Sequence, residues 1–279
     1  MRKHLCALSA VLTFGIAPIL TATTAYADSV EELTIAHRGA TTSQLGEGTL
    51  PSYQYAVKHH ADLLDADVRW TKDGSDPDNL GTMVILHDAT LNRITNCSGA
   101  VSSWLWSAIR DKCRTDIGGQ RLMRLIDLLK YGNSVGKSFA LEIKTSPIID
   151  AQAKQFWNAI KNSRVQLAAT SARIATLNKI KKLDAADPNH RISYALATLG
   201  TGGWPSASTI KQTGSAVYAK LTIPADVARS YRQANIKVIL FTSTNESQDA
   251  KMIALQPYAV VVNDVARFQR WRDAANGSL

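Results

Sequence analysis

Eight short apolar runs, each separated from the next by a longer segment, recur along this chain of 279 residues. They are rich in Val, Ile, Leu and Ala and occupy residues 33–39, 63–69, 138–144, 166–171, 192–197, 215–221, 237–242 and 258–263. Strands that are apolar along their whole length are typical of a parallel sheet covered by helices. Several intervening segments open with Ser, Asn or Pro, as helices often do, and predict helices at 51–59, 148–163, 172–183, 224–234, 245–255 and 265–274.

Eight alternations of strand and helix within about 250 residues predict an α/β fold of the (β/α)8 TIM-barrel type. An open doubly wound sheet is the alternative, but the glycine fingerprint that opens the first helix of many such sheets is absent. One stretch breaks the alternation, with an extra strand at 82–88 and then a Cys-, Trp- and Gly-bearing segment at about 88–120. We interpret it as a small insertion after the second strand of a single barrel domain at 28–279.

The first 27 residues have the three parts of a secretory signal peptide. A basic head is followed by an apolar stretch from about Leu5 to Leu20, and Ala25 and Ala27 supply the small residues before a cleavage site. Cleavage after Ala27 would release a secreted protein, whereas an N-terminal core helix is the alternative. The mature chain has no second long apolar run, so stable membrane insertion is not expected.

Composition limits the classes of partner. Apolar residues make up 45% of the chain and charged residues 20%, which indicates a globular protein with a sizeable core. The net charge of +9 favours anionic surroundings, such as membrane surfaces, cell wall or phosphorylated solutes. The basic residues are scattered, without a dense run or an aromatic stacking pattern, so no nucleic acid is expected. No protein partner is inferred.

Two cysteines, Cys97 and Cys113, remain after the predicted cleavage, and both lie in the insertion. An oxidising compartment converts neighbouring thiols of exported proteins into bridges, so we expect a disulfide. Two free buried thiols are the alternative.

Ionisable residues cluster where the predicted strands end. Reactive groups of such barrels sit at the carboxyl ends of the strands. The first strand ends in His37 and Arg38, the second in Asp65 and Asp67, and later ends carry His87, Glu142 and Lys144. So many ionisable groups suit a functional site better than a core.

Asp65 and Asp67 are two residues apart, so on a strand they project to the same face, which in a barrel is the interior. Two buried carboxylates repel each other unless a cation separates them, and Glu142 can converge on the same point. Carboxylates without a nearby cysteine or imidazole cluster favour Mg²⁺ or Ca²⁺ over Zn²⁺. The alternative is an internal salt-bridge network that uses Arg38, Arg69 and Lys144.

His37 and His87 flank this acidic cluster from neighbouring strand ends. Because the ordinary pKa of histidine is near working pH, such a pair can serve as general base and general acid. Arg38 and Lys144 place fixed positive charge beside the expected cation, which suits a bound phosphate.

The motifs AHRGA, EGT, LDADVRWTKDG, VILHDATLNRIT, SGAVSSW, LIDLL, LEIK and the late VILFTS and VVVND occur in this order. As a set they resemble the glycerophosphodiester phosphodiesterases, which belong to the superfamily of phosphatidylinositol phospholipase C-like phosphodiesterases. The resemblance implies a (β/α)8 barrel and hydrolysis of glycerophosphodiesters, such as glycerophosphocholine and glycerophosphoethanolamine, to glycerol 3-phosphate and an alcohol. It also implies an enzyme that needs one divalent cation, Mg²⁺ or Ca²⁺.

By position, the resemblance makes His37 and His87 the acid/base pair, and it makes Asp65, Asp67 and Glu142 the metal ligands. Arg38 and Lys144 match the phosphate-contacting cations, and Glu47 matches an acid that lies near the metal and the glycerol. Trp204 and Phe241, assigned to later strand ends, are candidates for the wall on the alcohol side, with ordinary packing as the alternative for each.

Three positions depart from the family pattern. Asp65 stands where the family usually has Glu, Gly48 stands where it usually has Asn, and the connection 75–81 is longer than its usual short turn. These departures bear on metal and head-group preference. Alternative functions are cleavage of the other ester bond, which releases phosphocholine or phosphoethanolamine, action on intact phospholipid, and phosphate-ligand binding by an inactive barrel.

Overall fold

A closed barrel of parallel strands forms the centre of the computed structural model, which describes residues 32–72, 80–188 and 192–277. The strands are β1 (Leu33–Ala36), β2 (Leu63–Trp70), β4 (Ser138–Ile143), β5 (Leu167–Ser171), β6 (Ile192–Thr198), β7 (Ala216–Lys220), β8 (Lys237–Ser243) and β9 (Ala259–Val262). Because β1 pairs in parallel with both β2 and β9, the sheet closes on itself. The barrel prediction is confirmed, and the open sheet is wrong.

Two sequence expectations fall wholly or largely outside the described residues. These are the signal peptide at 1–27 and most of the connection 75–81. Within the described ranges, none of the helices has both the length and the apolar character needed to cross a bilayer.

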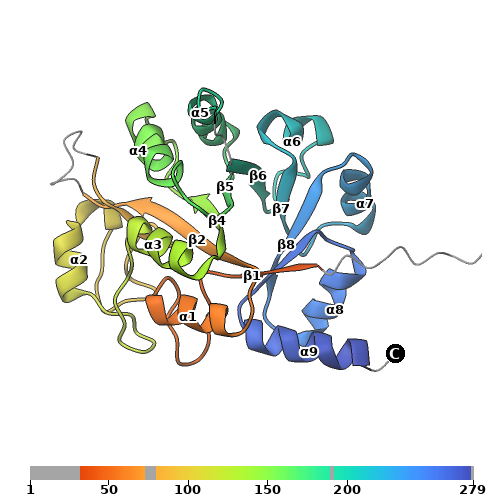
Figure 1. Cartoon of the computed structure of the whole chain (residues 1–279), viewed down its shortest axis with the longest axis horizontal. Helices are drawn as coiled ribbons and strands as arrows, with labels where there is room; N and C mark the ends of the chain where they lie inside the picture. The colour runs from red at the N-terminus through yellow and green to blue at the C-terminus, as the bar shows by residue number, and fades with distance from the viewer. Residues whose placement is uncertain (1–31, 73–79, 189–191, 278–279) are drawn as a thin grey trace, which may run out of the picture. The chain divides into compact units, whose positions relative to one another are not determined.

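Helices follow the strands and surround the barrel (Figure 1). They are α1 (Leu50–Lys58), α3 (Leu125–Val135), α4 (Asp150–Ile160), α5 (Ile174–Asp184), α6 (Ala207–Thr213), α7 (Ala225–Gln233), α8 (Glu246–Ala254) and α9 (Val265–Gly277). The local sequence fixes the start of α1, where the Thr49 side chain accepts a hydrogen bond from the Ser52 backbone and a proline occupies the first turn.

The sequence pattern did not single out α3 and α6 as helices. Helix α6 is only 7 residues long. Helix α3 contains Gly132, a poor helix former, but a Cβ at this position would come within 2.0 Å of the Phe139 ring on β4. The glycine therefore lets α3 pack closely against the barrel.

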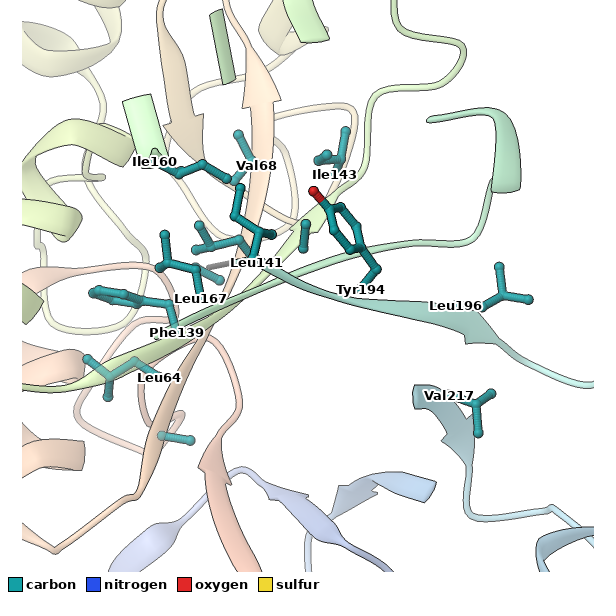
Figure 2. Packing of buried hydrophobic residues seen from close by; sticks show 14 of the residues in the cluster. Leu64, Val68, Phe139, Leu141, Ile143, Ile160, Leu167, Tyr194, Leu196 and Val217 are labelled. Atoms are coloured by element: carbon teal, nitrogen blue, oxygen red, sulfur yellow. The ribbon is translucent and has the colours of Figure 1, made fainter. Parts of the chain in front are cut away.

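Side chains alternate between two layers along each strand, as the pleat requires. One layer fills the space between strands and helices, and Figure 2 shows Leu64, Val68, Phe139, Leu141 and Leu167 gathered there with Ile160 of α4. The other layer points into the barrel and includes Ile35, Ala140, Ala195, Tyr218 and Ile239. Asp65 and Asp67 on β2 and Glu142 on β4 occupy the alternate positions whose side chains point into the barrel.

The insertion follows a short strand, β3 (Met83–Ile85), that pairs antiparallel with β2. It contains a 3-10 turn at Val101–Ser103 and α2 (Trp106–Lys112). A separate small cluster of buried side chains supports it, formed by Val84, Leu86, Leu91, Val101, Ile109, Cys113 and Leu122. The predicted insertion after the second barrel strand is thus present, although the extra strand is shorter than the predicted 82–88.

A disulfide joins Cys97 to Cys113, as the sequence predicts, with a sequence separation of 16 residues. Closing a loop of this size lowers the entropy of the unfolded chain, and we expect its loss to lower the free energy of unfolding by about 3 kcal/mol. Urea denaturation of the Cys97→Ala/Cys113→Ala double variant tests this. An unchanged free energy of unfolding would mean that the bridge adds nothing to the core of the insertion.

Candidate active site

A cavity of about 390 Å³ lies at the carboxyl ends of the barrel strands. Its walls bring together most of the residues that the sequence singled out, which are His37, Arg38, Asp65, Asp67, His87, Glu142, Lys144 and Phe241. This is the end of the barrel at which enzymes with this fold place their reactive groups. The cavity is therefore the candidate active site.

The three carboxylates come from the two neighbouring strands β2 and β4. Asp65 and Asp67 are buried, and Asp67 lies opposite Glu142 in the parallel register. The Lys144 ammonium contacts both strands, with its Nζ 3.0 Å from a Glu142 oxygen and 3.7 Å from Asp67 Oδ1. Strand periodicity thus places the three acidic groups on the cavity side of the two strands.

Asp65 and Asp67 lack full compensation for their charge. Burial raises the pKa of Asp65 well above its usual range, and repulsion from Asp67 and Glu142 adds to the effect. Burial also raises the pKa of Asp67, although Arg38 opposes this. Arg38 Nε forms an ion pair with Asp67 Oδ2 at 3.0 Å but is not aligned for a hydrogen bond, so this buried oxygen accepts no hydrogen bond from any described residue. An additional cation here would relieve the repulsion.

These carboxylates fit a hard divalent cation by their chemistry, because Mg²⁺ and Ca²⁺ prefer oxygen ligands. Asp67 Oδ2, which is ion-paired with Arg38 but accepts no hydrogen bond from a described residue, offers one such ligand. Within the part of the chain that the structure describes, no three His, Cys, Asp or Glu side chains are grouped closely enough to hold a metal ion. The carboxylate oxygens that could bind a cation are present, and in this structure the Lys144 ammonium neutralises part of their charge. Arg38 and Lys144 thus form the ion pairs of the alternative interpretation.

His37 is held in a neutral state. Its Nδ1 lies 2.6 Å from Oδ1 of Asn263, just beyond β9. Because an amide oxygen accepts hydrogen bonds, Nδ1 carries the proton and Nε2 keeps a lone pair. Burial lowers the pKa of His37 to about 4, and the nearby Arg38 guanidinium contributes. At neutral pH this imidazole can accept a proton.

His87 has a charged partner instead. Its Nδ1 lies 2.6 Å from Oδ1 of Asp88, and a guanidinium nitrogen of Arg69 donates to its backbone oxygen over 2.7 Å. Burial lowers the pKa of His87, but the interactions with Asp67 and Asp88 oppose this shift. The pKa of His87 is lowered overall, and the Asp88 carboxylate on Nδ1 is the contact that favours its protonated, proton-donating form.

Arg38 occupies a left-handed backbone conformation, with φ of 54°, directly after β1. Such a conformation costs a non-glycine residue about 1–3 kcal/mol and persists only where neighbours fix it. Here the Arg38 backbone N–H donates to Asp65 Oδ2 over 3.1 Å. The turn ends β1 at Ala36, earlier than the predicted 33–39, and it places Arg38 at the cavity.

Glu47 lies between two guanidinium groups. Arg38 contacts it at 3.1 Å and Arg93 at 2.6 Å, and together they lower the pKa of Glu47 against the effect of burial. Arg93 also pairs with Asp88, the partner of His87. A chain of charges therefore runs from His87 through Asp88, Arg93 and Glu47 to Arg38. The neighbouring Gly48 has φ of +70°, a conformation that glycine adopts without strain.

The two predicted aromatic wall residues differ in position. Phe241 lines the cavity. Trp204 does not line it and is partly buried against the main core, with its ring packed on Gly200. Trp204 lies in the loop after β6 and not at a strand end, so its placement on the cavity wall is wrong. The exposed Leu199 lines the cavity near this loop.

Sequence reasoning missed Asn263 and Arg93 as partners of the site. Both stand inside quoted motifs, VVVND and VILHDATLNRIT, but neither residue type by itself indicates that it supports a histidine or a carboxylate. Asn263 lies 226 residues from His37 in the sequence. The signal available was that Asn263 lies at the end of a predicted strand, whereas no comparable signal marked Arg93.

The sequence model of the Glycerophosphoryl diester phosphodiesterase family matches residues 37–267, a range that includes every one of these side chains. The chain belongs to this family. It is 30% identical over 133 residues to the glycerophosphodiester phosphodiesterase of Bacillus subtilis, an alignment that covers 43% of this chain and 43% of the relative. A glycerophosphodiester phosphodiesterase of Caldanaerobacter subterraneus is 26% identical over 162 residues, covering 55% of this chain and 63% of the relative.

Solved structures share the fold. A phosphodiesterase of Oleispira antarctica, in complex with its product sn-glycerol-3-phosphate, superposes with a TM-score of 0.74 at 19% identity, covering 86% of this chain and 96% of that one. A glycerophosphodiester phosphodiesterase of Thermotoga maritima gives 0.67 at 17% identity, covering 86% and 98%. These likenesses independently support the barrel.

Proposed function

We propose that this protein hydrolyses glycerophosphodiesters, such as glycerophosphocholine and glycerophosphoethanolamine, to glycerol 3-phosphate and an alcohol. The observation that carries the proposal is that His37 and His87 line one cavity while their Nδ1 atoms are held by partners of different charge. Binding alone would not require two imidazoles in different protonation environments. Membership of the family supports the same reaction.

The two imidazoles have separate roles in this proposal. His37, neutral and with a free lone pair on Nε2, takes the proton from the attacking hydroxyl, which is that of the glycerol or of water. His87, whose imidazolium Asp88 stabilises, gives a proton to the departing alcohol. Asn263 and Asp88 therefore act by fixing the tautomer and orientation of the two rings.

Arg38 and Lys144 would bind the phosphodiester oxygens, since both charges reach the cavity. Asp65, Asp67 and Glu142 are the residues that would hold Mg²⁺ or Ca²⁺. When bound, the cation would neutralise phosphoryl charge and polarise the oxygen atoms around phosphorus. The Asp67 oxygen that accepts no hydrogen bond from a described residue and the raised pKa values of Asp65 and Asp67 support this assignment.

Phosphorus NMR of the purified protein with each diester tests the reaction. We expect glycerol 3-phosphate as the phosphorus-containing product. Phosphocholine or phosphoethanolamine would instead assign cleavage to the other ester bond. Turnover of phospholipid vesicles without turnover of soluble diesters would show a lipid-directed enzyme, and turnover of neither would favour a binding protein.

The chain of charges through Arg93 predicts a smaller effect on catalysis than the changes at the histidines. We expect Arg93→Met to lower kcat/KM by about tenfold, because hydrogen bonds to charged groups are worth about 1.5–3 kcal/mol and other contacts partly compensate. The thermal midpoint should change little, since the side chain is 47% exposed.

Arg110→Met is the matched control for Arg93→Met. Arg110 is 51% exposed, belongs to the same insertion and pairs with Asp111 outside the cavity. Steady-state kinetics of both variants show whether the loss of the Arg93 guanidinium lowers kcat/KM more than the loss of the Arg110 guanidinium. Equal activity of the two variants would contradict a positioning role for Arg93.

We also propose that the protein acts after export. The sequence predicts cleavage after Ala27, and the disulfide in the insertion suits an oxidising compartment. Mass spectrometry of the protein from the culture medium should give an N-terminus at Asp28. Recovery of the uncleaved chain inside the cell would contradict export.

A further inference from the structure

The walls of the active-site cavity divide into two chemically different halves. The charged half comes from β1 to β4 and the residues just beyond these strands, and its lining side chains are His37, Arg38, Asp65, Asp67, His87, Glu142 and Lys144. The uncharged half comes from β5 to β9 and the residues just beyond them, and it is lined by Ala172, Ala197, Thr198, Leu199, Tyr218, Phe241, Thr242 and Val261. The uncharged half therefore suits a part of a ligand that needs no ionic partner.

Leu199 is the most exposed large apolar side chain on this cavity. It directly follows β6, lines the cavity and is 55% exposed. Single apolar side chains on a convex surface are ordinary, but apolar side chains that line a concave site supply contact area for a ligand. Phe241 of β8 lines the same half and is only partly buried. Leu199 and Phe241 thus offer accessible apolar surface to a bound molecule.

The turn that carries Leu199 is held in place by its neighbours. The Gly200 backbone N–H donates to Thr198 Oγ1 over 3.2 Å, and the Gly203 N–H donates to the Gly200 oxygen over 3.1 Å. The Trp204 ring packs so closely on Gly200 that a Cβ there would come within 2.6 Å of it. Because the turn is already ordered, Leu199 can contact a ligand without a large loss of conformational entropy.

The proposed function, on which this inference rests, indicates which part of the substrate meets Leu199. Arg38 and Lys144 would bind the phosphodiester oxygens, and the histidines would serve the attacking and departing oxygens, so the reacting atoms lie at the charged half. The far end of the departing alcohol has no such role. Ethanolamine ends in an ammonium group with three hydrogen-bond donors, which is costly to remove from water without acceptors or a carboxylate. Choline ends in three methyl groups and has no N–H donor.

We propose that Leu199, together with Phe241, packs against the far end of the departing alcohol and selects alcohols that end in methyl groups over ethanolamine. Choline fits this class, and so does its uncharged carbon analogue 3,3-dimethylbutanol, since the contact is apolar. Leu199 is in this proposal a specificity-determining residue. It acts on the choice of alcohol and not on the proton transfers.

Leu199→Ala tests the contact with three diesters of glycerol phosphate, those of choline, dimethylbutanol and ethanolamine. We expect kcat/KM to fall about tenfold for the first two, because each CH₂-sized group removed from water contributes about fourfold. The ethanolamine diester should lose less than about twofold. Comparing each substrate with itself in the wild type cancels the different chemical reactivity of the three alcohols. Leu199→Met, which keeps the apolar surface, should restore most of the lost activity.

Ile149→Ala is the matched control. Ile149 is 56% exposed and lies just before α4, but it does not line the cavity. Its loss should leave kcat/KM unchanged for all three diesters, and neither exposed residue should affect the thermal midpoint. An equal loss for all three diesters in Leu199→Ala, or no loss for any of them, would overturn the proposal while leaving the proposed function intact.

Calorimetric titration separates this inference from the proposed function. If the wild type turns over none of the three diesters, the proposed function fails, but their binding still tests the contact. Binding of the choline and dimethylbutanol diesters about tenfold weaker to Leu199→Ala than to the wild type and to Ile149→Ala supports the inference. Equal affinity for the three proteins, or no binding of either diester to the wild type, overturns it.

Discussion

We expect the replacement of His37 by alanine to lower the turnover of glycerophosphocholine by about 10²–10⁴-fold, the usual contribution of a positioned acid or base. We expect His87→Ala to have an effect of similar size on the same substrate, because choline is a poor leaving group that needs a proton. His37 accepts the proton in this account since its pKa is about 4 and its Nδ1 is held by an amide. His87 donates one since its Nδ1 is held by a carboxylate.

A diester with a p-nitrophenol leaving group distinguishes the two roles. This leaving group departs without protonation, so we expect His87→Ala to recover most of its lost activity on glycerophospho-p-nitrophenol. His37→Ala should stay impaired on both substrates, since the attacking hydroxyl still has to lose its proton. Recovery of His37→Ala, with no recovery of His87→Ala, would reverse the assignment.

Asp67→Asn is the second change with a large expected effect. Asp67 is buried, and its Oδ2 is ion-paired with Arg38 but accepts no hydrogen bond from a described residue, so its replacement tests the proposed cation site directly. Changes in the outer shell of metal sites cost about 10–100-fold in affinity or activity, and we expect the loss of a ligand to cost at least about 100-fold in kcat/KM. Raising the Mg²⁺ or Ca²⁺ concentration should restore part of this activity.

Asp127→Asn serves as the control for this variant. Asp127 lies on α3 and pairs with Arg124 at 2.8 Å, away from the cavity. Its activity and metal dependence should match those of the wild type. If Asp67→Asn also kept the activity and metal dependence of the wild type, Asp67 would be a partner of the internal ion pairs and not a ligand.

The fold and the acidic cluster could be predicted from the sequence because both follow from simple periodicities. Apolar runs that recur with helices between them specify a covered parallel sheet. The two-residue spacing of Asp65 and Asp67 specifies one face of a strand, and the parallel register then brings Glu142 beside Asp67. No long-range information was needed for these steps.

The residues that hold the site's side chains in place, Asn263 and Arg93, could not be predicted in the same way. Asn263 meets His37 only because β9 closes the barrel against β1, and Arg93 meets Glu47 only because the insertion folds back over the first loop. Trp204 was misplaced because the length of the loop after β6 does not show which side chain turns toward the cavity.

The most direct test uses metal-free protein and glycerophosphocholine. Phosphorus NMR measures the formation of glycerol 3-phosphate before and after a divalent cation is added. We expect no product before the addition, product after adding Mg²⁺ or Ca²⁺, and none from His37→Ala under either condition. Undiminished turnover by the metal-free protein, or equal turnover by His37→Ala and the wild type, would contradict it.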